Sequence, residues 1–160
     1  MKDIDIKINF SQLEKDLKDI SKELKGYTGV RAGFYQEEKE KDSDLTVAEV
    51  ALANEFGTMG ENGIRIPPRP FIRNTLKKED MWRRIFSQLC KKKNSLGLVL
   101  RQIGHVMRND MIKSIDSNIP PPNSEKTIKK KGSSHTLIDT GTMRNSIHIG
   151  LIKDKNDTDN

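Results

Sequence analysis

The 160 residues suffice for one domain, but only 33% are apolar and 32% are charged, so we expect a modest core that carries long polar segments. The net charge of +6 favours an anionic partner, whereas the single cysteine excludes an intrachain disulfide framework and fits a reducing compartment. No apolar run approaches the roughly 20 residues of a membrane helix, and the alternating N-terminus lacks the pattern of a signal peptide.

The first part of the chain predicts a strand, a helix and a second strand. Residues 4–10 alternate isoleucine or phenylalanine with polar side chains, which is the period of a half-buried strand. Residues 11–26 open with capping-box spacing, repeat apolar side chains at helical intervals and end in glycine, so we expect a helix. Apolar and other side chains alternate again at residues 30–34, which predicts the second strand. Residues 37–44 then form a polar loop of two lysines and five acids, with net charge −3.

The middle of the chain predicts helices on both sides of a stretch rich in glycine and proline. Thr46 and Glu49 have capping-box spacing, and the helix that they open should end near Gly57. Residues 54–71, NEFGTMGENGIRIPPRPF, hold three glycines and three prolines, which predict a stiff loop or hairpin. This stretch can be a simple connector or a fixed edge for a partner. After Pro70 we expect one further helix with the apolar stripe Ile72, Leu76, Trp82, Phe86 and Leu89.

The longest predicted helix spans residues 96–115 and has Asn94 or Ser95 as its N-cap. Its apolar stripe consists of Leu96, Val99, Leu100, Ile103, Val106, Met107, Met111 and Ile115. Gly97 and Gly104 inside it each cost about 1 kcal/mol relative to alanine. We therefore expect close packing against a neighbouring backbone at these glycines.

The C-terminal part predicts an extended basic arm, a helical turn and a third strand. The arm covers residues 119–136, contains three consecutive prolines and four lysines, and has few apolar residues, so we expect it to be mobile in a free subunit. Asp139 or Thr140 can cap one short helical turn, and residues 147–151 alternate as a strand. Residues 153–160 are a polar tail.

These elements predict an α+β fold in a single domain over residues 1–152. Few strands alternate irregularly with several helices, which favours a small, mostly antiparallel sheet packed with several helices, one of them long, plus the extended arm. We find no internal repeat.

No group of residues has the spacing of a known catalytic or metal site. His105, His135 and His148 form no metal-ligand pattern, and we interpret His105 and His148 as structural or exposed. Cys90 lies on or near an apolar helical stripe without a nearby histidine, which favours a small buried side chain over a nucleophile. The Asp-Thr-Gly at 139–141 matches the aspartic-protease tripeptide but occurs only once. We therefore expect no enzyme activity, no metal and no cofactor.

Residues 69–93 are strongly basic, with nine lysines or arginines against two acids, a net charge of +7. They can form a solvated helix face, a basic stripe that binds DNA, or a docking face for an acidic protein surface. Aromatic residues make up 5% of the chain and do not interleave with the lysines, which argues against a stacking platform for single strands. A DNA-binding accessory protein that uses residues 69–93 and the lysine-rich arm is the alternative function.

Three ordered blocks cover residues 45 to about 150. In the first, the helix end Glu55-Phe56-Gly57-Thr58 precedes the helix start Ile66-Pro67-Pro68-Arg69-Pro70-Phe71. The second block runs from Asn123 to Gly132, and the third contains Asp139, Thr140, Gly141, Arg144 and Ser146. In this order the blocks resemble the tail-completion and virion-morphogenesis proteins of tailed bacteriophages.

The resemblance implies a structural protein of the phage neck or tail end, without catalytic residues. Such proteins form a ring, commonly six-fold, between the tail tube or tail terminator and the head connector or stopper. The chain is then expected in the virion and, during assembly, in the host cytoplasm. The block residues and the arm lysines Lys126, Lys129, Lys130 and Lys131 become candidate contacts between subunits and rings. The basic charge suits acidic connector or tube surfaces, or non-specific contact with DNA in the lumen.

Overall fold

The computed structural model describes residues 26–35, 37–41, 43–61, 63–92 and 94–153, together with Ser11, Glu14, Lys15 and Lys18. The strand expected at 4–10, the apolar positions of the helix expected at 11–26 and the tail from 154 onward lie outside the described residues.

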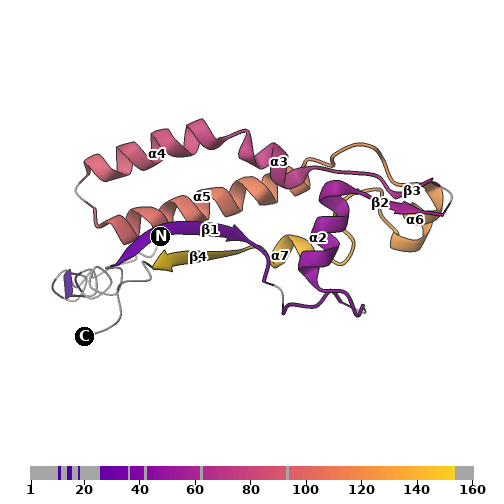
Figure 1. Ribbon diagram of the computed structural model, residues 1–160, viewed down its shortest axis with the longest axis horizontal. Coiled ribbons are helices and arrows are strands. Elements are labelled where there is room, and N and C mark those ends of the chain that lie inside the picture. Colours follow the sequence, from indigo (N-terminus) through magenta and orange to yellow (C-terminus); the bar gives the residue numbers. More distant parts are fainter. Residues whose placement is uncertain are drawn as a thin grey trace, which may run out of the picture.

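The strands of the described part form two antiparallel pairs (Figure 1). β1 (Tyr27–Gly33) pairs with β4 (His148–Lys153), so that Val30 lies opposite Leu151 and Ala32 opposite Ile149. β2 (Thr58–Gly60) and β3 (Gly63–Ile66) form a short hairpin within the glycine- and proline-rich stretch. The predicted strands at 30–34 and 147–151 and the α+β class are confirmed.

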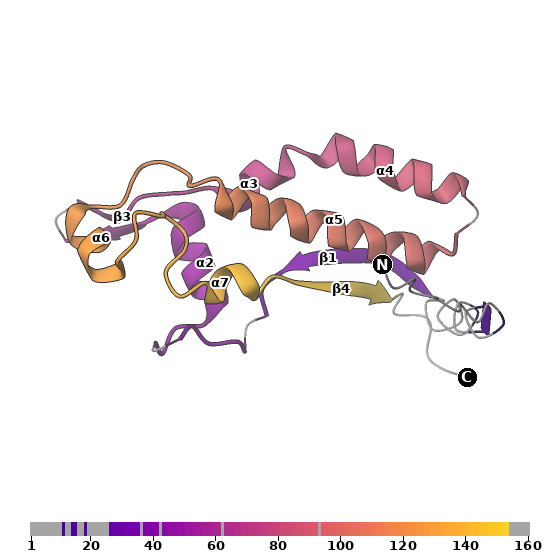
Figure 2. The same cartoon turned by 180° about the vertical axis from the view of Figure 1, so that it is seen from behind.

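The helices are α2 (Val47–Phe56), α3 (Phe71–Leu76), α4 (Glu79–Lys91), α5 (Leu96–Asp116), α6 (Glu125–Lys131) and α7 (Thr142–Asn145). In one half of the elongated molecule, α4, α5 and the β1–β4 pair lie in three layers, with α5 in the middle (Figure 1). The other half contains α2, α7, the hairpin and α6, as the view from behind also shows (Figure 2).

Side-chain caps set the starts of several helices. At α2, the Thr46 hydroxyl accepts a hydrogen bond from the Glu49 N–H at 3.2 Å, and the Glu49 carboxylate accepts from the Thr46 N–H at 2.8 Å. Ser95 caps α5 and Ser124 caps α6 in the same way, each accepting from the N–H three residues on. The predicted capping box of α2 and the Ser95 cap are confirmed because these hydroxyls satisfy N–H groups that lack a partner within the helix.

α5, with 21 residues, is the long helix that the sequence predicts, and the β1–β4 pair packs directly on it. A Cβ atom at Gly104 would lie 2.8 Å from Val30 Cγ2 and 3.4 Å from Ile149 Cβ. Such a distance to Val30 is too short for a carbon–carbon contact, so only glycine allows the strands to approach this far. The close packing expected at Gly104 is confirmed, although side chains of the strands, not their backbone, make the contact.

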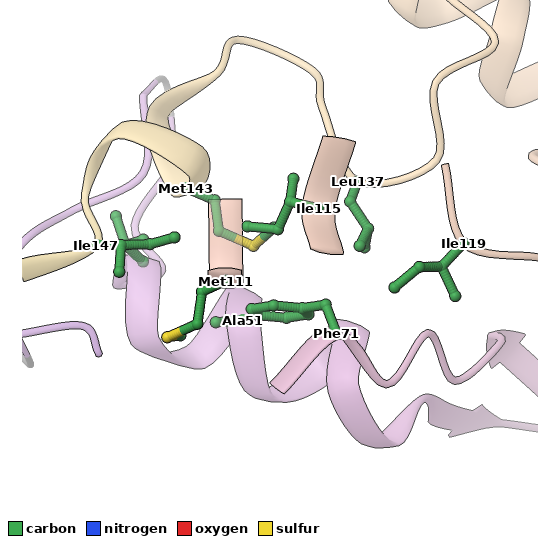
Figure 3. Packing of buried hydrophobic residues seen from close by; sticks show 9 residues of the cluster. Ala51, Phe71, Met111, Ile115, Ile119, Leu137, Met143 and Ile147 are labelled. Atoms are coloured by element: carbon green, nitrogen blue, oxygen red, sulfur yellow. The ribbon is translucent and has the colours of Figure 1, made fainter. Parts of the chain in front are cut away.

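The main buried cluster lies where α5 meets α2, α3 and α7 (Figure 3). Its members are Val47, Ala51, Phe71, Met111, Ile115, Ile119, Leu137, Met143 and Ile147. Further along α5, Val99, Leu100 and Ile103 are buried as well, which confirms most of the predicted stripe. Leu96 is an exception: it is about half exposed at the first turn of the helix.

The single helix expected after Pro70 is two helices, α3 and α4, separated at Lys77 and Lys78. The fully buried side chains of α3 are Phe71 and Thr75. Thr75 can be buried because its hydroxyl donates to the Phe71 carbonyl at 2.8 Å. Of the predicted stripe in this helix, Ile72 packs partly buried against the main cluster, whereas Leu76 is 53% exposed, so the stripe was wrong at Leu76.

Cys90 is exposed, so its predicted burial is wrong. The buried face of α4 is centred on Trp82, and Leu89, seven residues later, lies on nearly the same side of the helix. Cys90 lies about 100° further round the helix and points away from the core.

Candidate functional site

The first and second sequence blocks meet around Arg69, at the end of the molecule that holds the hairpin. The Arg69 N–H donates to the Asn54 carbonyl at 2.7 Å. Its side chain donates from Nε to the Pro121 carbonyl and from Nη2 to Asn123 Oδ1, each at 3.0 Å. We call the residues joined here the motif junction: Asn54, Glu55, Arg69, Pro121, Asn123, Lys131 and His135.

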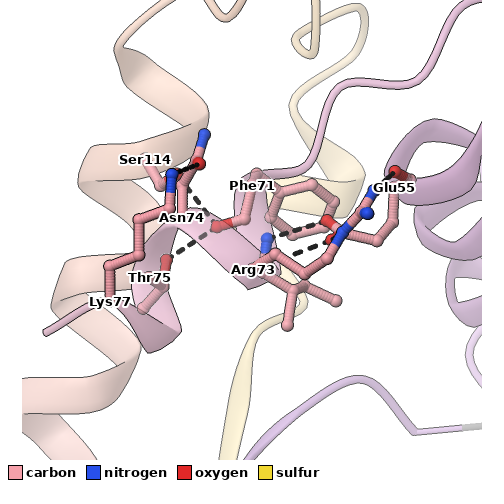
Figure 4. A network of polar contacts seen from close by, with 8 residues as sticks. Glu55, Phe71, Arg73, Asn74, Thr75, Lys77 and Ser114 are labelled. Carbon is pink, nitrogen blue, oxygen red and sulfur yellow. Dashed lines mark hydrogen bonds and ion pairs between the residues drawn. The ribbon is translucent and has the colours of Figure 1, made fainter. Parts of the chain in front are cut away.

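Glu55 joins the end of α2 to the start of α3 (Figure 4). Its carboxylate is 2% exposed and accepts hydrogen bonds from the N–H groups of Ile72 at 2.8 Å and Arg73 at 3.2 Å, and from Arg73 Nε at 2.8 Å. Arg73 Nη2 also donates to the Glu55 carbonyl at 2.8 Å. Because the first N–H groups of a helix have no partner within it, Glu55 stabilises α3, which begins after Pro70 without a side-chain cap of its own.

Gly57 ends α2 with a φ of 76°, which L side chains rarely adopt. A Cβ atom here would lie 2.7 Å from the Ile66 carbonyl oxygen and 2.9 Å from the Pro68 nitrogen. The chain after the hairpin therefore passes directly over the end of α2, and Thr58 pairs with Ile66 in the hairpin. This geometry makes Gly57 necessary both for its backbone angle and for the missing side chain.

Three exposed apolar side chains follow one another along the chain at the end of α2 and in β2. Leu52 and Phe56, one turn apart on α2, are 60% and 62% exposed, and Met59 in β2 is 77% exposed. Phe56 is also fixed from one side, because the Arg73 guanidinium carbon lies 5.1 Å from the centre of its ring. We call Leu52, Phe56 and Met59 the apolar face.

The predicted extended arm contains a helix, so its expected extended conformation is wrong, whereas its mobility in a free subunit stays a prediction. α6 is capped by Ser124 at its start and by Gly132, with a φ of 69°, at its end. Lys126, Lys129 and Lys130 are exposed, as expected of residues outside the core, and no side chain of α6 is fully buried. The segment is held to the domain by Ile119, which belongs to the main buried cluster, and by the hydrogen bonds that the Arg69 side chain donates to Pro121 and Asn123.

Three further hydrogen bonds join the start of the segment and α6 to the returning chain at its end. Lys131 is half-buried and donates to the His135 carbonyl at 2.8 Å. Asn123 Nδ2 donates to the same carbonyl at 2.9 Å, and the Thr136 N–H donates to Asn118 Oδ1 at 2.8 Å. Short-range polar pairing of this kind leaves no apolar pattern in the sequence, which is why composition alone predicted an unstructured arm.

The third block forms the turn that leads into α7 and β4. Thr140 Oγ1 donates to Glu40 Oε1 at 2.9 Å and accepts from the Thr142 N–H at 3.1 Å, but neither Asp139 nor Thr140 is the N-cap of α7, so the cap expected at these residues is wrong. Gly141, with a φ of 83°, takes the N-cap position itself. Asp139 is exposed beside this turn.

Arg144 and Ser146 do not belong to the motif junction. Arg144 forms a two-pronged ion pair with Asp116 at the end of α5, with distances of 2.6 and 2.8 Å, and its hydrogen bonds lower the pKa of Asp116. Ser146 donates to Glu38 Oε1 at 2.8 Å, and His148 Nε2 lies 2.9 Å from Glu38 Oε2. The hydrogen bonds from Ser146 and His148 lower the pKa of Glu38.

The cluster of Ser146, Glu38 and His148 does not have the geometry of a hydrolase. A nucleophilic serine is hydrogen-bonded to the histidine that takes its proton, but here the Ser146 hydroxyl is bonded to the glutamate. Among the described residues there is also no group of three His, Cys, Asp or Glu side chains that could hold a metal ion. The cluster instead ties the loop before α2 to the start of β4.

Sequence reasoning missed a buried polar link between α4 and α5. Asp110 is 5% exposed and accepts from Lys78 Nζ at 2.9 Å and from Trp82 Nε1 at 2.8 Å. Burial raises the pKa of Asp110, but the hydrogen bonds from Lys78 and Trp82 outweigh it and hold the pKa below its usual value. The sequence feature that could have revealed this link is Asp110 itself, which lies two helical turns after Ile103 and therefore on the apolar side of the long helix.

The chain matches no protein-family model, no curated protein and no solved structure. Within the described part, no helix is both long and apolar enough to cross a membrane.

Proposed function

We propose that the chain is a structural virion protein of the phage neck or tail end, which forms a ring that completes the tail and joins it to the head connector. The observation that carries the proposal is the apolar face, Leu52, Phe56 and Met59, presented to solvent by the first sequence block. Neighbouring exposed apolar side chains on a rigid support are typical of a protein–protein contact.

The support behind the apolar face is rigid for identifiable reasons. Glu55 fixes the last turn of α2 to α3, Gly57 turns the chain tightly, and Arg73 packs over Phe56. A preorganised surface loses little side-chain entropy when a neighbour binds. More of the free energy gained by burying its apolar side chains therefore contributes to the binding affinity. If every copy makes the same contact with the next copy, and the rotation between neighbouring copies closes on itself, the copies form a ring.

In this proposal, the other partners are the head connector or stopper and the tail tube or tail terminator. The exposed lysines Lys126, Lys129 and Lys130 lie on α6, and their charge complements acidic surfaces of such neighbours. The same positive charge allows non-specific contact with DNA in the lumen. The role is structural, and no step of it requires a catalytic residue, a metal or a cofactor.

The direct test uses the phage that encodes the chain. Deleting the gene should leave filled heads and complete tails that do not join, as seen by electron microscopy, and antibodies against the chain should label the neck of normal particles. Finished particles that form without the gene, or that do not contain the chain, would contradict the proposal.

A second test compares two leucines with similar exposure. Leu52→Glu places a charge in the apolar face, whereas Leu96→Glu places one at the far end of α5, where Leu96 is 49% exposed. Both variants should melt within a few degrees of the parent, since surface substitutions usually change stability by less than about 0.5 kcal/mol. Only Leu52→Glu should prevent incorporation into particles. Equal incorporation of both variants would remove the apolar face from the proposal.

The alternative function, DNA binding by an accessory protein, is supported by the outer side of α4. Arg83, Arg84 and Lys91 line a shallow surface hollow of about 360 Å³, together with Ser87 and Gln88. Arg83 is already paired with Glu79 at 2.6 Å, which weakens the positive field of this side. Tight binding of the isolated protein to duplex DNA, falling steeply with salt and lost on substitution of Arg84, would favour the alternative.

A further inference from the structure

A basic cavity of about 420 Å³ opens beside the motif junction. Three cationic residues line it, Arg65, Arg69 and Lys131, and its lining includes no acidic residue. A smaller cavity of about 220 Å³ shares the Asn54, Lys131 and Thr136 lining, and its lining also includes Lys41 and the acidic residues Glu40 and Asp139. The positive charge is therefore concentrated in the larger cavity.

Arg69 is a buried cation without a described counter-ion. The residue is 4% exposed, and its hydrogen bonds go to two neutral acceptors, the Pro121 carbonyl and the Asn123 amide oxygen. Among the described residues, no carboxylate oxygen lies within 4 Å of its guanidinium. Burial lowers the pKa of Arg69, since the charged form has lost part of its hydration. A buried charge with only neutral partners is costly, and an anion in the cavity would offset that cost.

Lys131 adds a second cation that is poorly compensated. Burial lowers the pKa of Lys131, Asp139 raises it, and the positive charge of Arg69 lowers it further. The Lys131 amine is held in place by its 2.8 Å bond to the His135 carbonyl. An oxyanion near Arg69 would favour the charged form of Lys131 as well.

Thr136 supplies an independent sign of a missing ligand. It lines the cavity and is 5% exposed, yet its Oγ1 has no hydrogen-bond partner among the described residues. Its backbone N–H is satisfied by Asn118 Oδ1, so the residue is held in position while its hydroxyl is not used. Buried hydroxyl groups are rarely left unpaired, and this one can donate to an anion in the cavity.

We propose that this cavity binds a phosphate group, held by the cations of Arg65, Arg69 and Lys131 and by the Thr136 hydroxyl. A phosphate carries more negative charge than a carboxylate at neutral pH, which suits three cations, and guanidinium groups recognise its oxygens through paired hydrogen bonds. The phosphate can belong to a free ion or phosphomonoester, or to a DNA backbone. The proposal does not depend on the role in the neck.

The test is titration of the purified full chain with inorganic phosphate, followed by amide NMR shifts and by calorimetry. One saturable site is expected, with shifts at Lys131 and Thr136. Arg65→Gln, an exposed position, should weaken phosphate binding on the order of tenfold, as expected for a lost charge-assisted hydrogen bond. Arg101→Gln, at an exposed position on α5, is the matched control and should bind as the parent does.

Thr136→Val separates a binding role from a structural one. Because the hydroxyl has no described partner, valine should not lower the melting temperature, but it should weaken phosphate binding on the order of tenfold. Thr136→Ser, which keeps the hydroxyl, should restore the affinity. No saturable binding at millimolar phosphate, or equal affinity of Arg65→Gln, Thr136→Val and the Arg101→Gln control, would overturn the proposal.

A short DNA duplex identifies the source of the phosphate. If the duplex competes with inorganic phosphate and Arg65→Gln weakens both, the site takes a backbone phosphate. If phosphate binds but the duplex does not compete, the ligand is a free phosphate or phosphomonoester.

Discussion

Replacing Glu55 tests whether this buried carboxylate, rather than apolar packing alone, holds α2 to α3. Glu55→Ala removes the acceptor of two backbone N–H groups in the first turn of α3, at Ile72 and Arg73. An unsatisfied buried donor costs about 1–3 kcal/mol. The ion pair adds less than about 1 kcal/mol, because the Arg73 side chain is 52% exposed. We therefore expect a loss of roughly 2–7 kcal/mol, a large part of a typical stability of about 5–15 kcal/mol.

Urea denaturation followed by the fluorescence of Trp82, the single tryptophan, measures this loss. Glu55→Gln keeps one acceptor oxygen and should cost about 1–2 kcal/mol, between the parent and the alanine variant. Glu79→Gln is the control, since Glu79 and Arg83 form an exposed pair one turn apart on α4 whose loss should cost less than about 0.5 kcal/mol. If Glu55→Ala were no less stable than the Glu79 control, the buried network would not be what joins the two helices.

Three further predictions concern backbone, core and pH. Gly57→Ala should destabilise the protein by more than about 2 kcal/mol, because its Cβ would lie 2.7 Å from the Ile66 carbonyl oxygen. Gly132→Ala, also at positive φ but in open space, should cost about 1 kcal/mol. Similar urea midpoints for the two variants would refute the steric argument. Ile103→Asp should not fold, since it places an unpaired carboxylate in a site that is 6% exposed, and a normal melting curve would contradict the core assignment. The folded protein holds the pKa of Glu38 below 4.5, so the unfolded chain binds more protons than the folded protein as the pH falls below about 4.5. The free energy of unfolding should therefore drop on acidification, and it should drop less in Glu38→Gln. Thermal melts at several pH values measure this difference.

The sequence by itself determined the elements whose signals are local. Each of these signals is formed by residues that are close together in the sequence. The signals are the capping box at Thr46 and Glu49, the Ser95 cap, the apolar repeat of the long helix and the alternation in β1 and β4. Caps and periodic burial act over one or two turns, so a pattern in the sequence suffices to predict them. The class of the fold followed from their order along the chain.

The candidate site depended on contacts that the sequence does not display. Arg69 meets Asn123 across 54 positions, and Glu55 meets Arg73 across 18, and no pattern in the sequence shows that these side chains bond to one another. Thr75 is buried because its hydroxyl bonds within its own helix, so the apolar pattern did not include it.

The lysine-rich segment shows the same limit most clearly. Its composition predicted an arm without structure, because it lacks the apolar area that offsets the entropy of ordering a chain. In the folded protein, Asn118, Asn123 and Lys131 bond to backbone groups of the returning chain and to Arg69, and they order the segment through polar contacts. Such bonds depend on which distant backbone groups come within about 3 Å. Only the tertiary structure decides that, because hydrogen bonds are directional and short, whereas burial of apolar side chains follows a pattern along the chain.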